Sequence, residues 1–240
     1  MNITLSNIGK RFNYEWIFRK VNYEFTSENN YVILGANGSG KSTLLQIITG
    51  NIIQSEGGVN YSIKDSQPFI NSNLTKDTSA NKKDLFREGK QTENCNIIIE
   101  NENIFSYLSF ASPYLDLFEE FTLVESINFQ AQFKPFFKDL DTNSIIELTQ
   151  LEKSKNKQLK FYSSGMKQKV RLALAILSNT PLLLLDEPTS NLDKKAIDWY
   201  QNLINNYSQN RLIIVCSNQQ EYEYTCCNKQ LQIEEFKENK

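Results

Sequence analysis

The stretch Gly35-Ala36-Asn37-Gly38-Ser39-Gly40-Lys41-Ser42 decides the fold of this 240-residue chain. It satisfies the pattern GxxxxGK(S/T), in which glycines let backbone N–H groups turn inward around a phosphate group. Residues 31–34, just before it, form a short apolar run typical of a buried strand, and residues 42–49 show helical spacing. Strand, glycine-rich loop and helix therefore follow in the order that a phosphate-binding loop requires.

The residue types of this loop predict the chemistry of its ligand. The Lys41 ammonium reaches the β- and γ-phosphates of a bound nucleotide, the Ser42 hydroxyl coordinates Mg²⁺, and the following helix adds the positive end of its dipole. A glycine-rich turn that merely precedes a helix is the alternative. We predict that the nucleotide contacts Gly35, Asn37, Gly38, Ser39, Gly40, Lys41, Ser42 and Thr43.

Two acids end a second buried run further along the chain. Residues 182–185 are four leucines, and Asp186 and Glu187 follow at what would be the carboxyl edge of a parallel strand, where ligands of open α/β sheets bind. We predict that Asp186 holds Mg²⁺ and that Glu187 acts as general base on the attacking water. A pair of solvated loop acids is the alternative.

Composition excludes several other classes of mechanism. The chain is 40% hydrophobic and 22% charged, as in a globular protein, and its formal net charge of −2 gives no reason to expect nucleic-acid binding. It contains no histidine, which excludes Ser-His-Asp hydrolysis and HExxH zinc chemistry. Carboxylates or lysines must therefore act as the general acids and bases.

The cysteines and the apolar runs bear on the compartment. The four cysteines show no CxxC spacing, which favours neither a zinc site nor a disulfide framework and fits a reducing cytoplasm. Residues 2–20 do not resemble a signal peptide, and the longest apolar runs, 172–177 and 182–185, are far shorter than the roughly 20 residues that cross a bilayer. We expect a soluble chain in the cytoplasm.

The order of periodic segments predicts an α/β fold. Alternating apolar residues before position 26 predict antiparallel strands, and short apolar runs at 182–185 and 212–215 predict parallel ones. Helical spacing occurs at 118–133, 145–151, 167–177 and 194–206. Residues 62–96 are polar and aperiodic, so we interpret them as an exposed excursion without chemistry.

Three further motifs give the chain a resemblance to the ATPase subunits of ATP-binding cassette (ABC) transporters, over essentially its whole length. Tyr162-Ser163-Ser164-Gly165-Met166 stands where that family has its LSGGQ signature, and Pro188-Thr189-Ser190-Asn191-Leu192-Asp193 resembles its D-loop. Phe121-Thr122-Leu123-Val124-Glu125 resembles the opening of its helical subdomain. An N-cap role for Ser163 is the simpler alternative at the signature.

The resemblance implies a fold and a division of the chain. The implied fold is a P-loop NTPase core with a mixed sheet, an N-terminal antiparallel β subdomain and an α-helical subdomain. It implies a single domain over 1–240: residues 1–110 carry the β subdomain and the glycine-rich loop, 111–162 the helical subdomain, and 163–240 the signature helix and the rest of the core.

It also implies a dimer around ATP and Mg²⁺. In the family the signature of one subunit covers the γ-phosphate held by the glycine-rich loop of the other, so Ser163, Gly165 and Asp193 are the expected contacts to the partner's nucleotide. An aromatic residue stacks on the adenine. Phe12 matches that position best, Tyr14 next and Trp16 least, and strand packing is the alternative.

Two departures from the family bear on hydrolysis. The usual glutamine before the helical subdomain is absent, and Ala111 stands at the best-matched position. Asn218 replaces the usual switch histidine, and its amide is able to donate a hydrogen bond to the γ-phosphate but has no charged form. We expect ATP binding to persist and turnover to be slow or partner-dependent, with Glu187, Lys41 and Asn218 as catalytic residues.

The resemblance therefore implies the ATP-hydrolysing subunit of a transporter. It would form a homodimer or a heterodimer with another ATPase subunit, lie at the inner face of the cell membrane, and drive transmembrane permease subunits. Residues 111–133 are the expected contact with those subunits, and inward packing of their apolar side chains is the alternative. A soluble ATP-gated clamp outside transport and a nucleotide-binding scaffold without hydrolysis are the alternatives.

Overall fold

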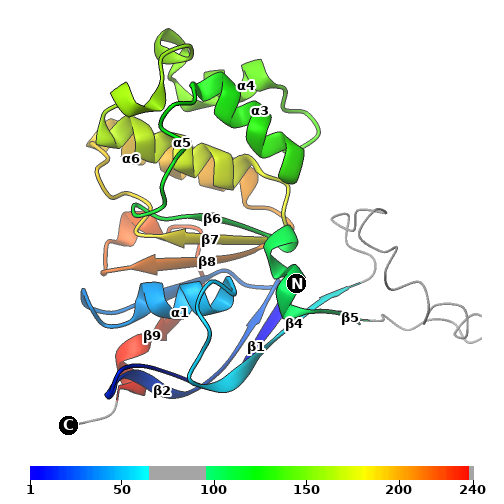
Figure 1. The fold of residues 1–240 in the computed structure, drawn as a ribbon, viewed down its shortest axis with the longest axis vertical. Coiled ribbons are helices and arrows are strands. Elements are labelled where there is room, and N and C mark those ends of the chain that lie inside the picture. Colours follow the sequence, from blue (N-terminus) through cyan, green and yellow to red (C-terminus); the bar gives the residue numbers. More distant parts are fainter. Residues whose placement is uncertain (65–95, 238–240) are drawn as a thin grey trace, which may run out of the picture.

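The computed structural model describes residues 1–64 and 96–237 and places helices on both faces of a central parallel sheet (Figure 1). Its strands are β1 (Asn2–Phe12), β2 (Glu15–Thr26), β3 (Tyr31–Leu34), β4 (Glu56–Lys64), β5 (Asn96–Ile99), β6 (Leu108–Ala111), β7 (Leu182–Asp186), β8 (Leu212–Ser217) and β9 (Lys229–Gln232). Its α-helices are α1 (Lys41–Ile48), α3 (Leu123–Phe133), α4 (Thr142–Thr149), α5 (Ser164–Leu177) and α6 (Lys194–Tyr207).

The parallel and the antiparallel strands lie in separate sheets. Strands β6-β7-β8-β3-β9 form a parallel sheet in that order, and β2-β1-β4-β5 form an antiparallel one. The predicted fold class, a P-loop NTPase core with an antiparallel N-terminal part and a helical part, is confirmed. The expected mixed sheet is instead divided into these two sheets, because the N-terminal strands pair with one another and not with β3.

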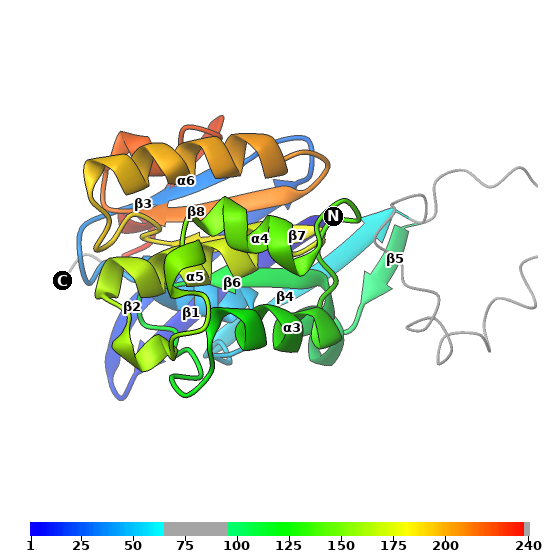
Figure 2. The same cartoon turned by 90° about the horizontal axis from the view of Figure 1, so that it is seen from above.

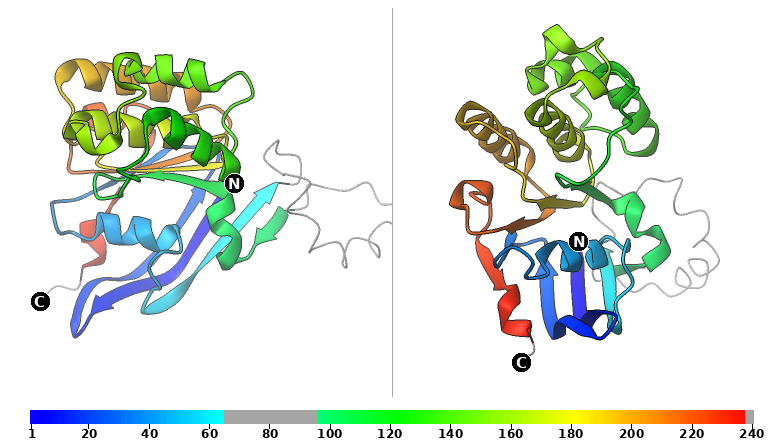
Figure 3. Two further views of the ribbon diagram at one scale, coloured as in Figure 1. Left: turned by 45° about the horizontal axis from the view of Figure 1, so that its top comes forward. Right: turned by 60° about the vertical axis from the view of Figure 1, so that its left-hand side comes forward.

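Alternating side chains of the parallel strands build two hydrophobic cores. On β7, Leu182 and Leu184 face α1 and the antiparallel sheet, whereas Leu183 and Leu185 face α5 and α6. Figures 2 and 3 show α5 and α6 over one face of the parallel sheet and α1 between the two sheets. Burial on both faces explains why these strands are continuously apolar.

Helix α3 begins at Leu123, five residues after the start predicted from apolar spacing. The Thr122 hydroxyl accepts a hydrogen bond from the Glu125 N–H at 3.2 Å, and the Glu125 carboxylate accepts one from the Thr122 N–H at 2.7 Å. This reciprocal capping box fixes the helix start. Phe118 and Phe121 contribute to the apolar spacing but precede the cap.

The first hairpin also differs from the expected alternation. Phe12 ends β1 and Trp16 lies at the start of β2, so these aromatic residues lie on either side of the turn and not on one strand.

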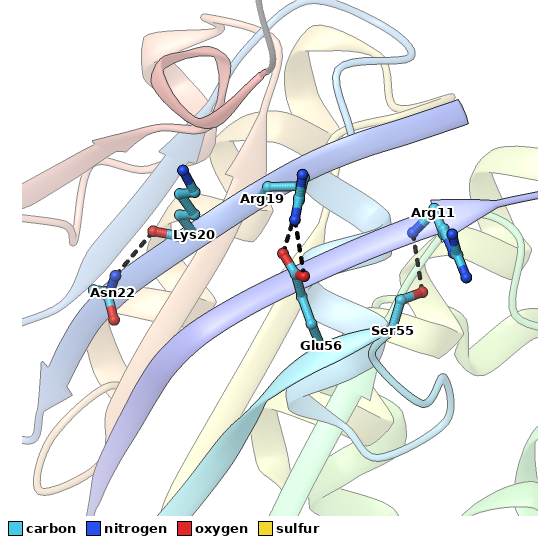
Figure 4. Close-up of polar contacts among 6 residues, drawn as sticks. All are labelled: Arg11, Arg19, Lys20, Asn22, Ser55 and Glu56. Carbon is cyan, nitrogen blue, oxygen red and sulfur yellow. Dashed lines mark hydrogen bonds and ion pairs between the residues drawn. The ribbon is translucent and has the colours of Figure 1, made fainter. Parts of the chain in front are cut away.

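Arg19 of β2 and Glu56 of β4 meet across β1. The Arg19 Nε donates to the Glu56 carboxylate at 2.9 Å (Figure 4). Gly9 of β1 leaves room for this contact, since a Cβ there would lie 2.6 Å from the Glu56 side chain.

The predicted polar excursion over residues 62–96 coincides only at its ends with described residues. Strand β4 continues to Lys64, and β5 begins at Asn96 and pairs with it. Residues 65–95 lie outside the described part of the chain.

Arg211 is a buried cation that joins α5 to the sheet, and its removal should destabilise the fold. It is 2% exposed, and its guanidinium donates to the carbonyls of Ile176 and Ser178 at 2.9 and 3.1 Å. Arg211→Met takes this donor from the Ile176 carbonyl and leaves the Ser178 carbonyl with the Thr180 N–H, so we expect the free energy of unfolding to fall by about 3 kcal/mol. Urea denaturation measures the free energy of unfolding, and Lys138→Met at an exposed position is the matched control. Equal stability of the two variants would contradict the role of Arg211 as donor to these carbonyls.

Candidate functional site

The glycine-rich loop connects β3 to α1 and is held by its own lysine. Lys41 Nζ donates to the carbonyls of Gly35 and Ala36 at 2.8 and 3.1 Å, and the residue is 4% exposed. Gly40 has φ +104°, and a Cβ on it would lie 2.6 Å from Ile17 Cγ2 of β2. Only glycine fits this position, because the backbone conformation and the neighbouring strand both exclude a side chain.

The loop offers donors suited to an anion. Gly40 is the N-cap of α1 and has no side chain to satisfy the first-turn N–H groups of the helix. The Ser39 hydroxyl is buried and has no hydrogen-bond partner among the residues that the structure describes. Gly38 has φ +74°, which turns the loop around this point. Uncapped amides, an unpaired hydroxyl and a lysine together fit a phosphate group.

Oxygen ligands gather beside the loop, at the end of β7. The Ser42 hydroxyl donates to Asp186 Oδ1 at 3.1 Å, and Asp186 is 1% exposed. Burial raises the pKa of Asp186 above its ordinary value, while the hydrogen bond from Ser42 opposes that shift. A carboxylate and a hydroxyl next to a phosphate site are the ligand types that Mg²⁺ takes in proteins.

Glu187 faces the same pocket from the turn after β7. Its backbone N–H donates to the Cys216 carbonyl of β8 at 2.9 Å, and its φ of +41° turns the chain away from the strand. Glu187 lines one pocket together with residues 37–43 of the glycine-rich loop. The structure thus brings the predicted general base and the predicted phosphate site together.

Asn218, which follows β8, reaches the glycine-rich loop as well. Its Nδ2 donates to Asn37 Oδ1 at 3.4 Å. Strand β8 lies between β7 and β3 in the sheet, so their carboxyl ends bring Asn218, Glu187 and the loop to one edge. The sequence-predicted catalytic residues therefore converge.

The signature residues line a different pocket. Ser163 caps α5, and its hydroxyl accepts a hydrogen bond from the Met166 N–H at 3.2 Å, as the simpler interpretation expected. A Cβ on Gly165 would lie 2.9 Å from the Asn191 carbonyl, so a glycine lets α5 approach the loop after β7. Asp193 caps α6 and lines this pocket with Ser163 and Gly165.

This pocket and the one at the glycine-rich loop share no residue. One chain therefore does not bring Ser163, Gly165 and Asp193 to its own phosphate loop. Both sites nevertheless lie on the same side of the molecule, because α1 and α5 both begin at the carboxyl edge of the parallel sheet (Figure 1).

The three aromatic candidates differ in their surroundings. The Phe12 side chain is 48% exposed, with Lys10 Nζ 4.9 Å from its ring centre, and Tyr14 is 95% exposed in the hairpin turn. The guanidinium carbons of Arg11 and Arg19 lie 5.5 and 4.1 Å from the Trp16 ring. None of the three lines the pocket of the glycine-rich loop, to which β2 contributes Ile17.

Sequence reasoning missed a serine and a glutamate near the site. Ala111 is buried at the end of β6, but Ser112 next to it directs its hydroxyl to Asp186 Oδ2 at 3.4 Å. Its place after a short strand, at the same edge as Asp186, was the available signal. Glu223 is buried against the loops that carry Glu187 and Asn218, and no sequence pattern indicated it.

Comparison with known proteins finds relatives over most of the chain. The sequence model of the family described as "ABC transporter" matches residues 18–190. The "Uncharacterized ABC transporter ATP-binding protein YybJ" of Bacillus subtilis is 28% identical over 232 residues, which cover 96% of this chain and 92% of the relative. The "Sulfate/thiosulfate import ATP-binding protein CysA" of Mesostigma viride is 28% identical over 231 residues, which cover 93% of this chain and 57% of that protein.

Solved structures share the fold. A putative ABC transporter ATP-binding protein from Pyrococcus furiosus has a TM-score of 0.70 at 14% identity, covering 99% of this chain and 100% of the other. A dimeric structure of the cassette MJ0796 in a post-hydrolysis state, bound to ADP and Pi, has a TM-score of 0.69 at 21% identity, covering 97% and 95% of the two chains.

Proposed function

Because the chain belongs to the ABC transporter family, we propose that it is an ATP-hydrolysing subunit that works as a dimer of identical copies and drives separate transmembrane permease subunits. The observation that carries the proposal is the separation of the two pockets: the phosphate loop and the signature face the same way from one sheet edge but share no residue. Two copies facing each other would complete both sites. The dimeric structure of MJ0796 supports this arrangement.

Each residue at the site then has a role. Lys41 and the loop amides hold the β- and γ-phosphates of ATP, and Ser42 and Asp186 hold Mg²⁺, which would neutralise charge on those phosphates. Glu187 takes a proton from the attacking water, and Asn218 donates to a γ-phosphate oxygen. The second copy contributes Ser163, Gly165 and Asp193 at the other side of the phosphates.

Phe12 is proposed as the adenine platform. It ends the strand that pairs with β2, and Ile17 of β2 lines the pocket of the glycine-rich loop. Its ring is half-exposed, with the Lys10 ammonium over it, and we propose that the base stacks on the exposed part. Trp16 is the weaker candidate because two arginines already lie against its ring.

The contact with permease subunits is proposed at an apolar groove beside α3. Residues on its wall include Leu115, Phe118 and Phe129, and Arg171 Nε of α5 donates to the Leu115 carbonyl at 2.6 Å. Phe118 and Tyr114 are 59% and 81% exposed. Such an exposed apolar patch is typical of an interaction site.

We also retain residues 1–240 as one domain, with 111–162 as the helical subdomain.

Among the described residues, no helix is long and apolar enough to cross a membrane. We propose that the chain is held at the cytoplasmic face of the cell membrane through the groove beside α3. Co-purification from detergent-solubilised membranes tests this. Recovery of integral membrane proteins with the intact chain, and their loss with Phe118→Glu, is expected; no membrane protein in either sample would favour a clamp outside transport.

Turnover by the purified chain should be slow. Ala111 cannot coordinate Mg²⁺, and Asn218 offers a neutral donor where the family has histidine. Removing this donor by Asn218→Ala should lower kcat by about 10²-fold with little change in KM. Steady-state phosphate release measures both values. Fast hydrolysis by the isolated chain would contradict the expected effect of these departures, and an unchanged kcat in Asn218→Ala would contradict the role of Asn218.

A further inference from the structure

Glu223 is a buried carboxylate outside the nucleotide pocket. It ends the short 3-10 helix Glu221–Glu223 and is 3% exposed. One carboxylate oxygen, Oε1, accepts hydrogen bonds from the Thr189 hydroxyl at 2.6 Å and the Thr189 N–H at 3.3 Å. The other, Oε2, accepts one from the Ser217 hydroxyl at 2.5 Å. Three donors on one carboxylate satisfy a group that burial would otherwise make costly.

The two partners of Glu223 belong to the two loops that carry the hydrolytic residues. Thr189 is two residues after Glu187, and Ser217 directly precedes Asn218. The Ser217 hydroxyl also accepts from the Gln220 N–H at 3.1 Å, which closes the turn around Asn218. Glu223 thus holds both loops from behind the pocket.

A backbone hydrogen bond also ties the loop that carries Glu187 to the end of β8. The Glu187 N–H bonds to the Cys216 carbonyl at 2.9 Å, at the point where both loops leave the sheet. Burial raises the pKa of Glu223, and the hydrogen bonds from Ser217 and Thr189 oppose that shift. Tyr200 of α6 is fully buried and donates to the backbone carbonyl of Glu223 at 2.6 Å, so it anchors the main chain and not the carboxylate.

We propose that Glu223 is a positioning residue for ATP hydrolysis, whose carboxylate fixes Glu187 and Asn218 relative to each other across the γ-phosphate. The inference rests on the proposed function, and it assigns Glu223 no contact with nucleotide or metal. Loss of the bridge leaves the phosphate loop intact, so ATP affinity persists. Misplacement of the base by about 1 Å lowers the rate of the chemical step by up to about 10²-fold.

The experiment compares steady-state hydrolysis of Mg-ATP by the full chain and by Glu223→Ala, Glu223→Gln and Tyr200→Phe. Glu223→Ala removes the bridge, and we expect kcat to fall at least about 10-fold with unchanged KM and unchanged ATP affinity. Glu223→Gln still joins both hydroxyls, as acceptor for one and donor to the other, and should recover part of kcat. Tyr200→Phe loses a buried hydrogen bond to the same residue but keeps the bridge, so its kcat should match the wild type.

Smaller changes cover the case in which Glu223→Ala does not fold. Thr189→Val and Ser217→Ala each remove one hydroxyl donor of the bridge, and each should lower kcat without weakening ATP binding. Wild-type kcat in both, or equal loss in Tyr200→Phe and Glu223→Ala, would overturn the inference and leave the proposed function standing. Absence of hydrolysis by the wild type above the level of Glu187→Gln would overturn hydrolysis as the function, and the inference with it.

Discussion

Glu187→Gln should lower the rate of ATP hydrolysis by about 10²–10⁴-fold while ATP still binds. The substitution keeps the size of the side chain and removes its ability to accept a proton. Glu187 lines the pocket of the glycine-rich loop, and its backbone is fixed by the bond to Cys216, so the amide should occupy the same place. In a chain without histidine no imidazole is present to replace it.

Phosphate release under saturating Mg-ATP measures this effect. Glu221→Gln is the matched control, because Glu221 is exposed and lies outside the pocket. A Glu187→Gln variant that hydrolyses as fast as the Glu221→Gln control would show that another group activates the water.

Lys41→Ala should weaken ATP binding by about 10²-fold, which corresponds to roughly 2.8 kcal/mol. The ammonium group is buried, and it bonds to the Gly35 and Ala36 carbonyls at the point where phosphates would enter. Removing it takes a charge-assisted donor away from the β- and γ-phosphates. The effect should be larger for ATP than for AMP, which lacks those groups.

Calorimetric titration with ATP and AMP measures both affinities, and thermal unfolding verifies that the variant is folded. Exposed Lys138→Ala controls for the loss of one positive charge. Unchanged ATP affinity in folded Lys41→Ala would contradict the assignment of the glycine-rich loop.

Much of the candidate nucleotide site was predictable because it depends on local sequence. A buried strand, a glycine-rich loop and a helix are contiguous, so residues 31–49 specify their own geometry. The position of the Asp186–Glu187 pair was equally predictable, since four leucines predict a buried strand that ends at those acids. That these segments meet at one sheet edge followed from the rule that ligands bind at the carboxyl ends of parallel strands.

The rest depends on contacts between distant segments. Ser112 meets Asp186 only because β6 pairs with β7, and Glu223 meets Thr189 and Ser217 only after the loops of two strands are in place. The helix start at Leu123 was readable from the Thr122–Glu125 capping box, but apolar spacing favoured an earlier start. Local patterns do not specify such pairings.

The proposed dimer consists of two facing copies that share two ATP molecules. Sedimentation of Glu187→Gln with Mg-ATP tests it most directly, because this variant should bind ATP without consuming it. We expect a species of twice the 27.8 kDa chain mass with Mg-ATP, a monomer with ADP, and a monomer with ATP bound when Gly165→Arg is added. A Glu187→Gln chain that binds ATP and remains at 27.8 kDa, or a dimer that Gly165→Arg leaves intact, would contradict it.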